Sequence, residues 1–159
     1  MYKHDFNKSV ILGDAGERKL IETYSYLKSD STDGHDMLDC RDGSSTSTIE
    51  VKTDFYDMNR TPNFFMERYS DDKTFKLGGP WRSESHNTDV FLYQFITNLK
   101  MFWFGDIPAL VAELDSYISK NNPRIVEVPN IRHTTLGYKI PRHVVADLYI
   151  ELDFGDILP

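Results

Sequence analysis

The chain has 159 residues and a formal net charge of −7, and 40% of its residues are hydrophobic. This length predicts one domain spanning residues 1–159, with enough apolar side chains to form a core. The acidic balance excludes a broadly basic nucleic-acid binder, and the single cysteine, Cys40, excludes an internal disulfide and a cysteine-rich zinc site. No run of 18 apolar residues occurs, and Met1 to Asp5 lack an apolar signal-peptide core, so we expect no membrane partner and a cytoplasmic location.

The first predicted element is a helix from Asp14 to about Ser29, after an extended lead-in over residues 1–12. An apolar stripe at helical spacing indicates this helix: Leu20, Ile21, Tyr24 and Leu27. Asp14 and Glu17 form an acidic variant of the capping box that marks a helix start. Glu17 also falls on the apolar stripe, so its carboxylate either caps the helix or faces a site, and the two roles can coexist.

A β-hairpin is predicted next, with a short strand from Met37 to Cys40 and a longer strand from Thr46 to Thr53. Asp42-Gly43 is a strong turn signal between them, because glycine adopts positive φ without steric cost. The second strand is rich in β-branched residues. Within it, Glu50 and Lys52 are two residues apart and so point to the same face, while Ile49 and Val51 point to the core.

Asp36 opens the first strand and can lie beside Glu50 at one end of the hairpin. Two close carboxylates repel each other unless a cation lies between them, and hard oxygen ligands favour Mg²⁺ or Mn²⁺. Such a metal would polarise a phosphoryl oxygen and lower the pKa of a bound water. Lys52 would hold that water or stabilise the charge on the phosphate. Spacing alone, however, favours a solvated strand face in which Glu50 and Lys52 form a weak surface ion pair.

A further strand is predicted from Asn63 to Tyr69, with Phe64 and Met66 on one face and Phe65 and Glu67 on the other. Glu67 either lies near the site or is solvated, and we favour the solvated position because charged strand residues are usually exposed.

The segment from Ser70 to Thr88 is predicted to be a long loop, a kind that is often functional. The Gly78-Gly79 backbone N–H groups, the basic side chains and Trp81 could bind phosphate and base together, unless Trp81 packs in the core. The candidate phosphate contacts in this loop are Lys73, Lys76 and Arg82.

The remaining predicted elements are strands, one helix and a tail. Asp106 can cap the helix, and Pro108 is tolerated in its first turn. The predicted strands are Asp89 to Phe95, Leu99 to Phe104, Arg124 to Val128 and one beginning near Thr134; the helix runs from Ile107 to about Ser119, and Asp147 to Pro159 form an acidic tail that either packs or frays.

Residues 124–143 form the most basic stretch of this acidic chain. They contain four Lys or Arg side chains and one acid, Glu127. This makes Arg132, Lys139 and Arg142 candidates for contacts to a nucleic-acid backbone. A solvated hairpin is equally consistent with the pattern.

Asp36, thirteen intervening residues and then Glu50-Val51-Lys52-Thr53-Asp54 resemble the D…(D/E)-x-K signature of the PD-(D/E)XK nuclease superfamily. The residues Gly13-Asp14-Ala15-Gly16-Glu17 resemble the start of a helix in many members, and Asn63 to Glu67 resemble the third core strand of phage and microbial members. The similarity covers roughly residues 11 to 96. No proline precedes the aspartate, and Asp39 competes with Asp36, which we prefer because Met37 and Leu38 follow it.

The resemblance implies an α/β fold in which a mixed central β-sheet is flanked by helices, with the restriction-endonuclease-like αβββαβ core. It implies a Mg²⁺- or Mn²⁺-dependent deoxyribonuclease, endo- or exonucleolytic, that hydrolyses phosphodiester bonds. Asp36, Glu50 and the Val51 carbonyl would bind the metal. Lys52 would orient the water, and Glu17 would assist the metal or its water.

The Gly-x-x-Gly-Glu helix start resembles that of Holliday-junction-resolvase-like and small phage members, which implies branched or junction DNA as substrate and a virus-encoded protein as one source. A cut on two strands would call for a homodimer. The alternative is a non-catalytic nucleic-acid-binding or assembly protein that retains the nuclease fold. A second alternative is a metal-independent binding protein whose hairpin is only structural.

Overall fold

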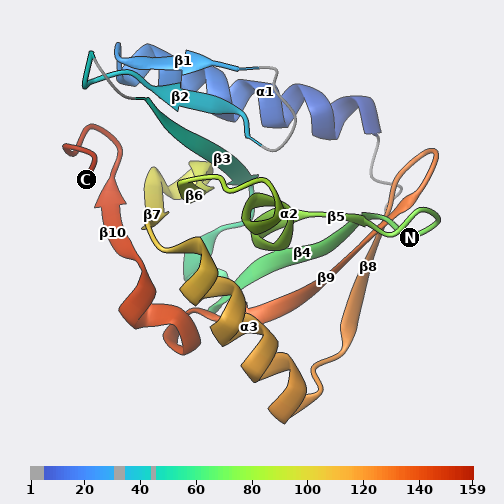
Figure 1. Cartoon of the computed structure of the whole chain (residues 1–159). Coiled ribbons are helices and arrows are strands. Elements are labelled where there is room, and N and C mark those ends of the chain that lie inside the picture. The colour runs from blue at the N-terminus through green and yellow to red at the C-terminus, as the bar shows by residue number, and fades with distance from the viewer. Residues whose placement is uncertain (1–5, 31–34, 44–45) are drawn as a thin grey trace.

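The computed structural model describes residues 6–30, 35–43 and 46–159, which form two β-sheets and three α-helices (Figure 1). The fold is mixed α/β, and helices flank the larger sheet, as the sequence predicts. None of the helices in these ranges is both long and apolar enough to cross a membrane.

The larger sheet has six strands in the order β1-β2-β3-β6-β7-β10. β3 and β6 run parallel, and every other neighbouring pair is antiparallel. The predicted hairpin is confirmed as β2 paired with β3, and Asp42 and Gly43 lie in its connection, whereas Ser44 and Ser45 lie outside the described residues. The strands are Leu27–Ser29 (β1), Met37–Asp39 (β2), Ser47–Asp54 (β3), Val90–Phe95 (β6), Lys100–Phe104 (β7) and Ile150–Asp153 (β10).

The helix α1 (Phe6–Thr23) covers one face of this sheet, where Leu20 and Tyr24 pack in a cluster with Met37, Ile49 and Leu92. The extended lead-in predicted over residues 1–12 is therefore wrong from Phe6 onward, and residues 1–5 lie outside the described ranges. The helix also ends before Leu27, which belongs to β1. The predicted capping box is wrong, because Asp14 and Glu17 lie in the interior of α1.

A second sheet, with strand order β5-β4-β9-β8, was not predicted, and it lies on the opposite side of the larger sheet from α1 (Figure 1). Phe64 of β4 is fully buried between the two sheets, with its ring 4.8 Å from that of Tyr93 and 4.9 Å from that of Phe102. The strand predicted at Asn63 is confirmed. Its expected place as a third core strand is wrong, because it pairs within the second sheet. The strands are Asn63–Asp71 (β4), Lys76–Leu77 (β5), Ile125–Pro129 (β8) and Thr134–Pro141 (β9).

Two further helices lie on the second sheet's side. α3 (Ile107–Asn121) begins as predicted at Asp106, whose Oδ1 accepts the Ala109 N–H at 3.0 Å. The predicted loop from Ser70 to Thr88 is wrong, because it contains β5 and the helix α2 (Gly79–Ser85). Of the two alternatives for the C-terminal tail, packing is confirmed, because β10 pairs with β7 and Leu158 is buried. Short 3₁₀ helices occupy Met58–Arg60 (η1), Ile96–Asn98 (η2) and Arg142–Leu148 (η3).

Candidate active site

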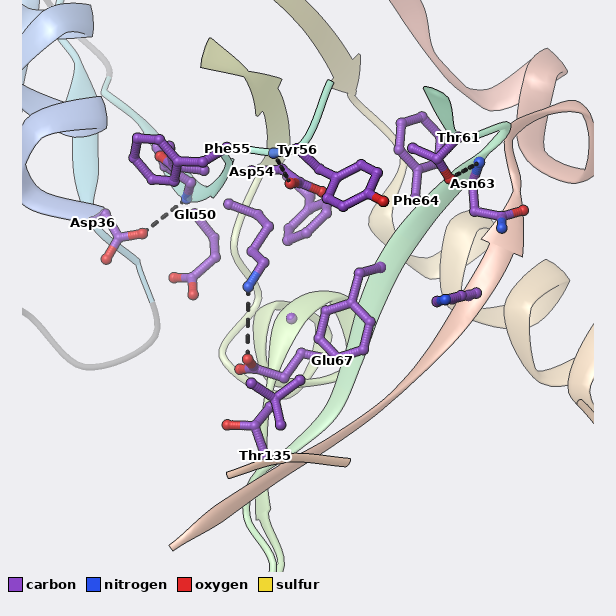
Figure 2. Close-up of a pocket in the computed structure, with 18 of the residues that line it drawn as sticks. Asp36, Glu50, Asp54, Phe55, Tyr56, Thr61, Asn63, Phe64, Glu67 and Thr135 are labelled. Carbon is purple, nitrogen blue, oxygen red and sulfur yellow. Dashed lines mark hydrogen bonds and ion pairs between the residues drawn. The ribbon is translucent and has the colours of Figure 1, made fainter. Parts of the chain in front are cut away.

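The site lies at the part of β3 that extends beyond its pairing with β2. β2 pairs with β3 only as far as Ile49, so the edge of β3 from Glu50 onward is open on that side. Asp36 occupies the opening: its backbone N–H donates to the Ile49 carbonyl at 2.9 Å, and its Oδ2 accepts the Val51 N–H at 2.8 Å. The Asp36 side chain thus replaces a paired strand and lies beside Glu50, as Figure 2 shows. The Val51 carbonyl faces the same edge, because both backbone groups of a strand residue point to the same neighbour.

Asp39 lies elsewhere. It is buried in an ion pair with Arg41, whose guanidinium also donates to the carbonyls of Leu158 and Pro159. These contacts attach the end of the chain to the hairpin. The structure therefore brings Asp36, and not Asp39, to Glu50.

Glu17 reaches the same place from α1 because Gly16 lets the helix approach β3 closely. A Cβ atom at Gly16 would lie 2.3 Å from Thr53 Oγ1 and 2.8 Å from Gln94 Nε2, so every larger residue would push the helix away. The next residue, Glu17, lines the pocket that also contains Asp36 and Glu50. Of the two roles left open for Glu17, the structure excludes the cap and retains the site.

The three carboxyl groups are held in an environment that disfavours their charge. Burial, together with the charges of Asp36 and Asp14, raises the pKa of Glu17 to about 7. Burial and the Asp36 charge raise the pKa of Glu50 to about 8. Burial also raises the pKa of Asp36, against the opposing effect of the Val51 N–H. A cation among these oxygens would relieve the repulsion.

Basic side chains approach these acids from two directions. Arg82 of α2 places its guanidinium 3.6 Å from Glu50 Oε1. Lys52 places Nζ 3.8 Å from Glu67 Oε1 and 5.6 Å from the centre of the Phe65 ring. Lys52 and Glu50 thus share one face of β3, as their spacing predicts.

Glu67 belongs to the site, contrary to the solvated position that we favoured from the sequence. It projects from β4 of the second sheet toward Lys52 (Figure 2). Gly78 packs directly against it, because a Cβ atom there would lie 2.6 Å from Glu67 Oε2. Sequence alternation placed Glu67 and Phe65 on one face of their strand, but only the packing of the two sheets brings that face to β3.

An open pocket of about 960 Å³ lies between β3, β4 and β9, and it is lined by Glu17, Asp36, Glu50, Lys52 and Glu67. Lys139 is the one predicted nucleic-acid contact that lines it. Lys73, Lys76 and Arg132 are exposed outside it, and Lys73 Nζ donates to the Arg132 carbonyl at 2.9 Å.

Other predicted phosphate contacts are committed to the protein itself. The Arg142 guanidinium donates to the carbonyls of Thr61 and Met58. It therefore connects η1 to the start of η3 instead of facing a ligand. Trp81 is buried and donates to Asp115 Oδ1 at 2.9 Å. The Gly78 N–H donates to the Arg68 carbonyl. Of the two alternatives for this segment, the structure confirms the one in which Trp81 packs in the core.

The donor set of the site suits a hard divalent cation. Glu50 Oε2 is buried and has no hydrogen-bond partner among the described residues, and the neighbouring Asp36 oxygen is only partly occupied by the Val51 N–H. Within residues 6–30, 35–43 and 46–159, no three His, Cys, Asp or Glu side chains are close enough to form a complete metal site. Asp36 and Glu50 therefore offer a two-carboxylate site that substrate or water oxygens would complete, as is common for Mg²⁺.

Comparisons with protein-family models, with curated proteins and with solved structures find no match for this chain.

Proposed function

We propose that the protein is a Mg²⁺- or Mn²⁺-dependent deoxyribonuclease that hydrolyses phosphodiester bonds. The observation that carries this proposal is the buried Glu50 Oε2, which has no hydrogen-bond partner in the part of the chain that the structure describes, beside Asp36 and on the same strand face as Lys52. Two oxygen donors that repel each other, with an ammonium group two residues along the strand, suit a phosphoryl substrate and a divalent ion.

The order of the elements supports a restriction-endonuclease-like core. α1 is followed by the antiparallel series β1-β2-β3, and α2 then leads into β6, which lies parallel beside β3. This is an αβββαβ arrangement in which β4 and β5 form an insertion that pairs with β9. In such a core, Asp36 would stand at the start of the second strand and Glu50 in the third.

Each side chain has a defined part in the proposed mechanism. Asp36 and Glu50 would hold the ion, with the Val51 carbonyl as a further oxygen donor at the open edge of β3. When bound, such an ion polarises the phosphoryl oxygen and lowers the pKa of a coordinated water. Lys52 donates to the attacking water or to the phosphate oxygen on which charge develops.

Glu67 and Glu17 act on either side of these residues. Glu67 Oε1 lies 3.8 Å from Lys52 Nζ. Because this ion pair is long, Lys52 can exchange it for a contact with a phosphate. Glu17, with a pKa near 7, can accept or release a proton at its carboxylate near neutral pH.

The test is incubation of purified protein with labelled single-stranded, duplex and branched DNA, with Mn²⁺ or with chelator. We expect cleavage only with the metal, and loss of cleavage in Glu50→Gln and Asp36→Asn. Calorimetry should detect divalent-ion binding to the wild type, and Glu50→Gln should weaken it strongly. Binding of DNA without cleavage of any substrate would instead support the non-catalytic alternative.

A further inference from the structure

The pocket differs in character between its rim and its floor. Its acidic lining residues are all buried or half-buried: Glu17, Asp36, Glu50, Asp54 and Glu67. Among the residues that the structure describes, the exposed ones that line the pocket include no acid: Phe55, Tyr56, Arg60, Pro62 and Lys139. A chain with a net charge of −7 thus presents a basic and aromatic rim above an acidic floor.

The two rim aromatics are exposed although their backbone is fixed. The Phe55 and Tyr56 side chains are 39% and 60% exposed. The Tyr56 N–H donates to Asp54 Oδ1 at 2.8 Å, and Thr97 Oγ1 donates to the Phe55 carbonyl at 3.0 Å. Two large rings therefore extend into water from fixed backbone positions beside the site (Figure 2), where bases of a ligand can stack on them.

The same region ties the two walls of the pocket together. The Tyr93 hydroxyl donates to Asp54 Oδ2 and accepts the Phe65 N–H at 3.0 Å, so it joins the end of β3 to β4. Lys139 of β9 lies directly across from Phe65 in the second sheet. Aromatic rings on the β3 side and a lysine on the β9 side consequently face one pocket with a fixed separation.

We infer that this rim binds an unpaired DNA strand, with bases stacked on Phe55 and Tyr56 and phosphates beside Arg60 and Lys139. Aromatic side chains next to basic ones are the usual platform for single strands, because every base offers a π face. The inference rests on the proposed function only for the hydrolysis at Asp36 and Glu50, and the binding of the strand at the rim does not depend on it. It narrows the substrate to single strands, overhangs, flaps or unpaired nucleotides at a junction.

The depth of the site argues against an intact duplex. Glu50 is only 8% exposed, so a phosphate must enter the pocket to reach it. Duplex DNA is stiff, with a persistence length of about 150 base pairs, and its bases stack on one another, so their faces cannot meet Tyr56. A single strand bends easily and exposes those faces.

Fluorescence anisotropy in EDTA tests the inference without any turnover, using a labelled single-stranded oligonucleotide and the duplex of the same length. We expect the wild type to bind the single strand more tightly than the duplex. Tyr56→Ala should weaken single-strand binding at least about fivefold, as loss of one stacked base does. Tyr56→Phe should keep the affinity, and Tyr56→Leu, which keeps apolar surface but loses the ring, should not.

The matched control is Phe75→Ala, because Phe75 is 63% exposed but lies outside the pocket. It should bind like the wild type. Equal affinity for single strand and duplex, or an unchanged affinity in Tyr56→Ala and Tyr56→Leu, would overturn the inference. Cleavage of single-stranded DNA by Tyr56→Ala at the wild-type rate would also overturn it while leaving the nuclease intact, whereas tight single-strand binding without cleavage would refute only the nuclease.

Discussion

Replacing Glu50 by glutamine should make the protein's stability much less dependent on pH. The pKa of Glu50 is raised from 4.5 to about 8, chiefly by burial and by Asp36. Below pH 4.5 this carboxyl group is protonated in both states and contributes nothing. As the pH rises from 4.5 to 8, the unfolded chain releases a proton that the folded chain retains, so the folded state loses stability.

The size of this effect follows from the shift. Each pH unit between the two pKa values costs about 1.4 kcal/mol, so the loss is about 3 kcal/mol at pH 7 and about 5 kcal/mol above pH 8. Glutamine keeps the size of the side chain and removes the titration. The free-energy difference between Glu50→Gln and the wild type should therefore shift in favour of the mutant by these amounts from pH 4.5 upward.

Urea unfolding in EDTA at pH 4.5, 7 and 8.5 measures this difference directly. Adding Mg²⁺ should stabilise the wild type more at pH 8.5 than at pH 4.5, because the ion binds the ionised carboxylates, and should stabilise Glu50→Gln far less. A difference in unfolding free energy between Glu50→Gln and the wild type that does not change with pH would refute this prediction, because it would show that the folded protein does not hold Glu50 in a protonated state.

Three other substitutions separate the site from the scaffold. Gly16→Ala should cost about 1–3 kcal/mol in urea unfolding and lower cleavage, because the new methyl group overlaps Thr53 and moves Glu17; unchanged stability would mean that the α1 contact is loose. Asp39→Asn should lower stability by about 1–3 kcal/mol and keep cleavage, whereas Asp36→Asn should abolish cleavage; the reverse pattern would reassign the metal ligand. Arg142→Met should cost about 2–3 kcal/mol without changing the salt dependence of DNA binding, because its guanidinium binds backbone carbonyls; a lower salt slope would return Arg142 to the DNA surface.

Local sequence signals predicted the elements whose stability is mostly local. β3 was found because its segment is rich in β-branched residues, and the spacing of Glu50 and Lys52 then predicted their shared face. The start of α3 was found because Asp106 is a strong capping residue, and the structure confirms its hydrogen bond. In both cases the deciding contacts lie within a few residues of one another.

The missed features depend on contacts between distant residues. β10 pairs Ile150 with Trp103, and β9 pairs Lys139 with Phe65, and no local pattern specifies such partners. Glu67 looked solvated because its neighbours in the sequence say nothing of the second sheet that carries it to Lys52. Arg60 was not predicted as a site residue for the same reason, although a basic residue close to Phe55 and Tyr56 in a connecting segment was a usable sequence signal.

A substitution of Lys52 tests metal-dependent DNA hydrolysis at this site most directly. The Lys52 ammonium lies 3.8 Å from Glu67 Oε1 and is partly exposed, so Lys52→Met should cost little stability, roughly 0–1 kcal/mol. The measurement is the rate of cleavage of a labelled single strand with Mn²⁺ by the wild type, by Lys52→Met and by Lys120→Met, an exposed control on α3. We predict a loss of at least about a hundredfold in Lys52→Met alone, the usual effect of removing one charge-stabilising donor. Cleavage by Lys52→Met at the wild-type rate would contradict the account.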